Sequence, residues 1–408
     1  MTATPITAVY DAVTSRRGFV FALTAVVVLF CGLRIFYSDG PSNIDVKEQL
    51  WMAVDWRMGY GSGANPPLFT WLVRLVDTVV GSIVASTEIV RFAFLWLFCF
   101  LGAATVRRMT GDAALAALSG LAPFAVFAVG WEALFRHSNT ILLMASIPMT
   151  LAALLRLDRR DDLGAYLLLG LVAAFGFYSK YNYAIVIAGF LGAALVDRAL
   201  RRRLLDRRVL VSLGVLLLLM SPLLHWIVGH LGGMLEHGRL RLGEDANYPG
   251  VPVAVSATID LVVVGLGLIM PLFAFLLLLC PRAALPLRDT GDEEGPRWRR
   301  FLAVYLGIVL LLLLVGIVMS GAVEFHDRYI YVLLPILPLA FLRLHAVGFR
   351  GSPRRLLALV LIVVIVSVVV GVAFRGANYA TRKASTDGPV TERVAYSPGP
   401  GWIADGGR

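Results

Sequence analysis

The sequence is poor in charge and in cysteine, and it contains neither an internal repeat nor a low-complexity tract. Only 16% of its 408 residues are charged, whereas a typical soluble domain has about 25%. The cysteines have no spacing typical of a metal site, and we expect them to be buried thiols: Cys31, Cys99 and Cys280. These shortages exclude an ordinary water-soluble enzyme and a metal site built on cysteine.

The sequence is rich in long apolar segments. Hydrophobic residues make up 58% of the chain, and many form runs of about 16–22 residues, long enough for a helix to cross ~30 Å of hydrocarbon. The pattern predicts an all-α, polytopic transmembrane bundle of about 11 spans. The predicted spans are 18–36, 89–106, 113–130, 139–155, 163–179, 182–197, 209–228, 257–280, 301–320, 329–345 and 355–374.

Arginine is concentrated in the short connections between alternate spans. The main groups lie at 107–108, 156–160, 198–208, 282–300 and 343–355. Because basic connections remain on the cytoplasmic side, the N-terminus is expected inside and the intervening loops outside. These arginines, facing anionic headgroups, account for most of the net charge of +10. We therefore expect membrane lipids as neighbours and no nucleic acid as a partner.

This orientation predicts how the chain is divided. Residues 1–17 are a cytoplasmic N-terminus, 18–374 form the transmembrane domain, and 375–408 are an outer, flexible tail. The first span lacks a small-residue cleavage site and is interpreted as an anchor. The first outer loop, 38–88, is expected to carry short amphipathic helices, one of them at 67–85. We also expect a flexible inner loop at 282–300 and a long outer loop at 229–252.

Several carboxylates lie in the first outer loop, between two strongly apolar segments. Ser42 and Asn43 are good helix N-caps, and a helix starting there would place Asp45, Glu48 and Asp55 on one face. One interpretation is a solvated helix. The other is a general base held at the membrane surface against an acceptor hydroxyl, with Asp55 and the nearby Arg57 as possible substrate contacts.

Three further outer turns each carry a cation beside aromatic or polar side chains. Lys180, one of only three lysines, lies in FYSKYNY, Arg328 in EFHDRYIY and Arg136 in WEALFRHSNT. Lys180 alone could extend to lipid headgroups, but three such turns together suit an anionic group such as a phosphate. The neighbouring possible substrate contacts are His137, Tyr178, Tyr181, His326 and Tyr329.

Five segments in this order resemble a known family. The segments are DVKEQLW…WRMGYGSGANPPLFTWL, FRHSNTILL, FYSKYNY, SPLLHW and DRYIYVLLPILP. Together they resemble the bacterial membrane glycosyltransferases of the aminoarabinose-transferase and protein-mannosyltransferase type, glycosyltransferase family 39/83, with the C-type (GT-C) fold. The resemblance covers roughly residues 20–345.

The resemblance implies an inverting glycosyltransferase that uses a polyprenyl-phosphate-sugar donor at the periplasmic face of the bacterial inner membrane. It assigns the catalytic base to Asp45 and donor-phosphate binding to Lys180 and Arg328. Much of the family has an adjacent Asp-Glu pair, whereas here Val46 follows Asp45 and the next acid is Glu48. Either carboxylate therefore remains a candidate for the base. Because fixed cations can stabilise the leaving phosphate, we expect no required cofactor or metal.

The expected acceptor is a cell-envelope glycan or lipid, such as lipid A or lipopolysaccharide. The alternative function is a transporter or flippase for a lipid-linked sugar. Transporters commonly show repeated halves and polar residues near the bilayer midplane. Here no repeat is visible, and the polar residues gather at the outer ends of spans. The sequence therefore favours transfer over transport.

Overall fold

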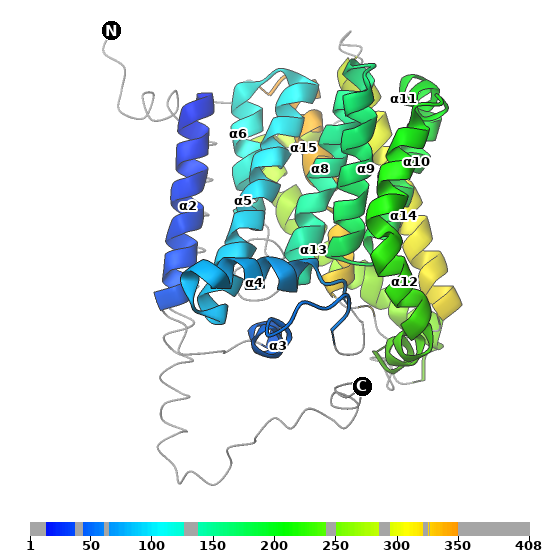
Figure 1. The fold of residues 1–408 in the computed structure, drawn as a ribbon. Helices are drawn as coiled ribbons and strands as arrows, with labels where there is room; N and C mark the ends of the chain where they lie inside the picture. Colours follow the sequence, from blue (N-terminus) through cyan, green and yellow to red (C-terminus); the bar gives the residue numbers. More distant parts are fainter. Residues whose placement is uncertain are drawn as a thin grey trace.

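The computed structural model describes residues 14–36, 44–60, 65–125, 138–241, 250–284, 294–320, 325 and 327–349, and this part of the chain is helical without strands. Figure 1 shows the helices gathered into one bundle. They are α2 (Arg16–Phe36), α3 (Ile44–Met52), α4 (Leu68–Val80), α5 (Ile83–Thr110), α6 (Ala113–Leu121), η1 (Ala122–Ala125), α8 (Asn139–Arg159), α9 (Leu163–Ser179), α10 (Tyr183–Val196), α11 (Arg198–Leu204), α12 (Val209–Arg241), α13 (Val253–Leu279), η3 (Pro281–Ala284), α14 (Glu294–Ser320), η4 (Asp327–Leu333) and α15 (Ile336–Ala346).

The bundle has the surface of a multi-pass membrane protein. Within the described residues, five helices are long and apolar enough to cross a bilayer, or six if the bent pair α10–α11 is one span. Leucines on α12, such as Leu217 and Leu218, are exposed where a soluble protein would place polar groups. By contrast, 83% of the most apolar stretch of α8 is buried. The predicted all-α bundle is confirmed, with α8 at its centre.

One predicted boundary was wrong, and two predicted spans lie partly or wholly outside the described residues. The span predicted over 113–130 is helical as far as it is described: α6 continues as a 3-10 helix over Ala122–Ala125, since Pro123 has no N–H to donate. Residues 126–130 lie outside the described part. The helix α12 continues to Arg241, into the expected loop 229–252. The predicted span at 355–374 lies outside the described residues.

The two ends of the bundle differ in chemistry. In Figure 1, α4 runs across one end of the upright helices, close to α3, while α11 lies at the opposite end. We call the first the α3 end and define it by α3, α4, Ser138–Thr140 and Ser179–Tyr183. We call the opposite one the arginine end, because arginines there pair with the aspartates that cap α9 and α11, Asp162 and Asp197.

A single arginine ties three helices together at the arginine end. The guanidinium of Arg297, in the first turn of α14, donates two hydrogen bonds to Asp158 of α8, at 2.9 and 2.7 Å. It donates two more to Asp197, between α10 and α11, at 2.7 and 2.8 Å. The ring of Trp298 lies below the guanidinium, 5.1 Å from its carbon. Residues 294–300 are therefore helical and anchored, and the prediction of a flexible loop throughout 282–300 was wrong.

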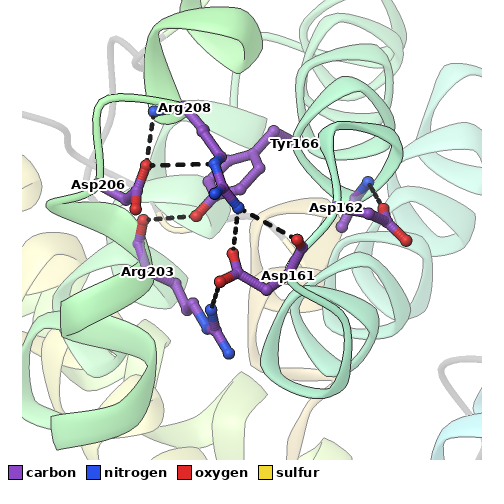
Figure 2. A network of polar contacts seen from close by, with 7 residues as sticks. Asp161, Asp162, Tyr166, Arg203, Asp206 and Arg208 are labelled. Carbon is purple, nitrogen blue, oxygen red and sulfur yellow. Dashed lines mark hydrogen bonds and ion pairs between the residues drawn. The ribbon is translucent and has the colours of Figure 1, made fainter.

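A second polar network closes the same end between α9, α11 and α12 (Figure 2). Asp161 binds the guanidinium groups of both Arg203 and Arg208. The hydroxyl of Tyr166 donates to the backbone carbonyl of Arg203 at 3.1 Å. These contacts join α9 to α11, which α10 separates from it in sequence, and to the start of α12, and so fasten this end of the bundle.

Replacing Arg297 by Ala should lower the melting temperature of the detergent-purified protein. Burial of Asp197 opposes its ionisation, but the hydrogen bonds and charge of Arg297, together with hydrogen bonds from the backbone N–H groups of Leu200 and Ala199, hold the pKa of that carboxyl below its usual value. The pairing therefore stabilises the fold at neutral pH and is lost only as pH falls through the lowered pKa. Leaving Asp158 and Asp197 without it should cost roughly 2–4 kcal/mol. Arg300→Ala, at an exposed position of α14, is the control, and an equal loss in both variants would contradict the assignment.

Candidate functional site

The helix α3 carries the predicted base candidates at the α3 end of the bundle. Its second residue is Asp45, whose side chain lies outside the described part of the structure; Glu48 is half-buried. Gln49, which the sequence analysis did not select, is fully buried. The helix ends at Met52, so Asp55 lies beyond it and does not share its face. Asp55 instead pairs with Arg57 at 2.7 Å, with both side chains more than half exposed.

The turn after α3, residues 53–60, is held by hydrogen bonds to α4. The indole of Trp71 donates to the Arg57 carbonyl at 2.8 Å, and Arg74 donates to the Ala53 carbonyl at 3.1 Å. Within the turn, the Tyr60 hydroxyl donates to the Asp55 carbonyl at 2.6 Å. The carbonyls of Ala53 and Arg57 thus have partners on α4, and that of Asp55 has one within the turn. The turn therefore fixes α3 relative to α4.

Aromatic side chains connect this turn to the long helices. The rings of Trp71 and Tyr178 lie 5.9 Å apart, and the Tyr178 hydroxyl donates to the Leu219 carbonyl of α12 at 2.9 Å. Gly59 lies directly against the ring of Trp226, in the predicted SPLLHW segment, and leaves no room for a Cβ atom. The first outer segment, FYSKYNY and SPLLHW are thus brought together.

Lys180 is buried at the α3 end. It caps the C-terminus of α9, only 9% of it is exposed, and its ammonium donates to the Thr140 hydroxyl of α8 at 2.8 Å. The side chain therefore points into the bundle, and the alternative in which it extends to lipid headgroups was wrong. Nearby, burial raises the pKa of Tyr181 to about 12, so this phenol keeps its proton and remains a hydrogen-bond donor.

The remaining predicted site residues are only partly described. The short helix η4, which contains Arg328, packs against α8, α10 and α13, close in space to the helices that flank Lys180. The side chain of Arg328 lies outside the described part, as do Arg136, His137 and His326. The ring of Tyr329 lies 5.6 Å from that of Phe325. No three His, Cys, Asp or Glu residues gather as a metal site within the described ranges, and metal independence stays a prediction.

The sequence analysis missed a buried ionic cluster behind α3. Glu88 of α5 accepts a hydrogen bond from Arg34, in the last turn of α2, at 3.1 Å, and one from Arg91. All three side chains are at least 94% buried, and α3 packs against α5. A charge at the edge of an apolar span is itself a signal of a functional or anchoring site. Arg34 and Arg91 lay inside predicted spans, whose overall hydropathy hid that signal.

The chain is similar to two lipopolysaccharide core galacturonosyltransferases of Rhizobium johnstonii. It is 29% identical to RgtB over 370 residues, which cover 89% of this chain and 72% of that protein. It is 30% identical to RgtA over 371 residues, covering 86% of this chain and 70% of that protein. The dolichyl-phosphate-mannose-protein mannosyltransferase family, PMT_2, matches residues 64–226.

The fold is similar to the crystal structure of ArnT from Cupriavidus metallidurans bound to undecaprenyl phosphate. The TM-score is 0.56 at 16% sequence identity, and the likeness covers 85% of this chain. This chain spans 63% of the length of that structure. At this level of identity the likeness establishes a shared fold.

Replacing Gly59 by Ala should disturb the turn that fixes α3, because the added methyl group would overlap the Trp226 ring. We expect a lower melting temperature and a changed tryptophan emission spectrum in detergent. Gly102→Ala, in α5 with open space around it, is the control and should be neutral or slightly stabilising. The packing is wrongly assigned if both variants behave alike.

Proposed function

This chain belongs to the C-type (GT-C) family of membrane glycosyltransferases, and we propose that it transfers a sugar from a polyprenyl-phosphate donor to lipopolysaccharide. The observation that carries the proposal is the buried ammonium of Lys180 at the α3 end. A cation in buried surroundings forms a strong charge-assisted contact to a phosphate. The undecaprenyl phosphate named with the ArnT structure has the required headgroup.

The proposed reaction is a direct displacement at the anomeric carbon of the donor sugar. A hydroxyl of the acceptor forms the new bond to this carbon as the bond to the phosphate oxygen breaks, and the configuration inverts. The hydroxyl proton passes to the carboxylate of Asp45, with Glu48 as the alternative base on α3. The phosphate leaves with the bonding electron pair, and its growing charge is stabilised by Lys180, Arg328 and Arg136. No metal takes part in this scheme.

The relatives supply the first candidates for sugar and acceptor. RgtA and RgtB are named for transfer of galacturonic acid to the lipopolysaccharide core. We propose the same class of acceptor for this chain, and galacturonic acid as the first sugar to test. The reaction takes place at the periplasmic face of a bacterial inner membrane, with the N-terminus and the arginine end in the cytoplasm.

The proposal is tested by comparing the lipopolysaccharide of a deletion strain with that of its parent by mass spectrometry. Loss of one sugar unit, restored by the gene in trans, is the expected result, and an unchanged glycan would refute it. Transfer by the purified protein in detergent separates the enzyme from the alternative transporter. An enzyme transfers sugar without a sealed compartment, whereas a transporter requires two compartments.

Replacing Asp45 by Asn should abolish transfer, with kcat falling by at least about a hundredfold, while donor binding is retained. Glu48→Gln is the parallel variant that decides which carboxylate of α3 is the base. Asp77→Asn, on α4 away from the proposed chemistry, is the control. Full activity in Asp45→Asn together with inactivity in Glu48→Gln would move the role of base to Glu48.

Replacing Lys180 by Met should raise the KM for the donor by roughly ten- to a hundredfold, because one charged hydrogen bond to the phosphate is lost. Lys180→Arg should recover part of the affinity. Met keeps the approximate length of the side chain and removes the ammonium, and the melting temperature is measured alongside the KM to separate loss of donor binding from loss of stability. A large loss of thermal stability with an unchanged KM would show that Lys180 has only a structural role.

A further inference from the structure

Few buried polar groups in the described part of the protein lack a hydrogen-bond partner, and most of them lie toward one end. They are both polar atoms of the Gln49 side chain, the side-chain amide oxygen (Oδ1) of Asn139, the hydroxyls of Tyr181 and Ser256, and the Nε atoms of Arg91 and Arg156. Buried polar groups in native proteins are nearly always paired. Each unpaired group is therefore expected to bind a ligand or an ordered water.

These groups gather toward the α3 end. Gln49 is on α3, Asn139 begins α8 and Tyr181 lies in the turn between α9 and α10. Ser256 is in the first turn of α13. Asp260 of the same helix accepts a hydrogen bond from the backbone N–H of Phe325 at 3.3 Å. Arg156, at the opposite end of α8, is the exception. Unpaired polar groups thus coincide with the end that carries Lys180.

Among these groups, the side-chain amide of Gln49 gives the strongest evidence for a bound ligand. The residue has no exposed surface, and neither its amide nitrogen nor its carbonyl oxygen has a partner among the described residues. Because both atoms are unpaired, exchanging their assignment would not satisfy them. A buried amide in this condition destabilises the fold. An apolar side chain of the same size would serve packing better, so packing does not explain why the chain has glutamine here.

The chemistry of the unpaired atoms indicates which ligand they would bind. The amide of Gln49 offers both a donor and an acceptor, and the unpaired atom of Asn139 is an acceptor. A phosphate is a poor partner for an acceptor, because an ionised phosphate oxygen has no hydrogen to donate. A sugar hydroxyl both donates and accepts. Gln49 also lies four residues after Asp45 in α3, and positions four apart on a helix lie one turn from each other.

We propose that Gln49 binds a hydroxyl of a reacting sugar and so positions that sugar beside the base. The side-chain oxygen of Asn139, next to the Lys180–Thr140 pair, is a second contact for a sugar hydroxyl. The inference rests on the proposed function and adds a sugar-binding residue to it. Gln49 and Asn139 recognise the sugar, while Lys180 recognises the phosphate. The hydroxyl can belong to the donor or to the acceptor glycan, and the kinetics distinguish the two.

The test replaces Gln49 by Met in the full chain, purified in detergent. Three quantities are measured: the melting temperature, the affinity for sugar-free undecaprenyl phosphate, and the KM values for undecaprenyl-phosphate galacturonic acid and for lipopolysaccharide core. We expect an unchanged or higher melting temperature and unchanged binding of undecaprenyl phosphate. One of the two KM values should rise by about tenfold, which is the effect expected from the loss of one or two hydrogen bonds. A rise in the donor KM assigns the hydroxyl to the donor, and a rise in the acceptor KM assigns it to the acceptor.

Thr150→Val is the matched control, because the buried Thr150 hydroxyl is paired with that of Tyr183 at 2.8 Å. It should lower the melting temperature and leave both KM values unchanged. Unchanged KM values in Gln49→Met, or a fall in its melting temperature without a kinetic effect, would overturn the assignment while wild-type transfer upholds the proposed function. If the wild-type protein transfers no sugar, the proposed function fails and the Gln49 assignment fails with it.

Discussion

The hydrogen bond from the Lys180 ammonium to the Thr140 hydroxyl joins two helices at the point where the proposed chemistry takes place. It links residues 40 positions apart, at 2.8 Å and almost without exposure to solvent. A charge in such surroundings is held by polar partners, of which the Thr140 hydroxyl is one. An incoming phosphate would bring a full negative charge, and the burial of Lys180 would strengthen the attraction between the two groups. The proposed binding site for the donor phosphate depends on the buried position of the Lys180 ammonium.

The rest of the bundle positions this group. At the arginine end, Arg297 joins α14 to α8 and to the α10–α11 corner. At the α3 end, hydrogen bonds from α4 fix the turn after α3, and the buried Arg34–Glu88–Arg91 cluster ties α2 to α5 behind it. Long helices fastened at both ends are a rigid support for a site built from separate segments.

Local signals in the sequence were sufficient for much of the fold. The span predicted at 163–179 matches α9 (Leu163–Ser179), because a continuous apolar run ends at the charged Lys180. The resemblance of five segments led to the family that the comparisons establish. The direction of Lys180 could not be predicted in this way, since its partner Thr140 is on another helix. The anchoring role of Arg297 depends on Asp158, 139 residues away. The lack of hydrogen-bond partners for Gln49 depends on which side chains of other helices pack around it.

A structure of the full protein with undecaprenyl phosphate, determined by cryo-electron microscopy, would test the central claim most directly. We expect the phosphate to lie at the α3 end, with an oxygen about 3 Å from the Lys180 ammonium and with α3 beside it. A phosphate bound at the arginine end, or at the α3 end but out of reach of Lys180, would contradict it.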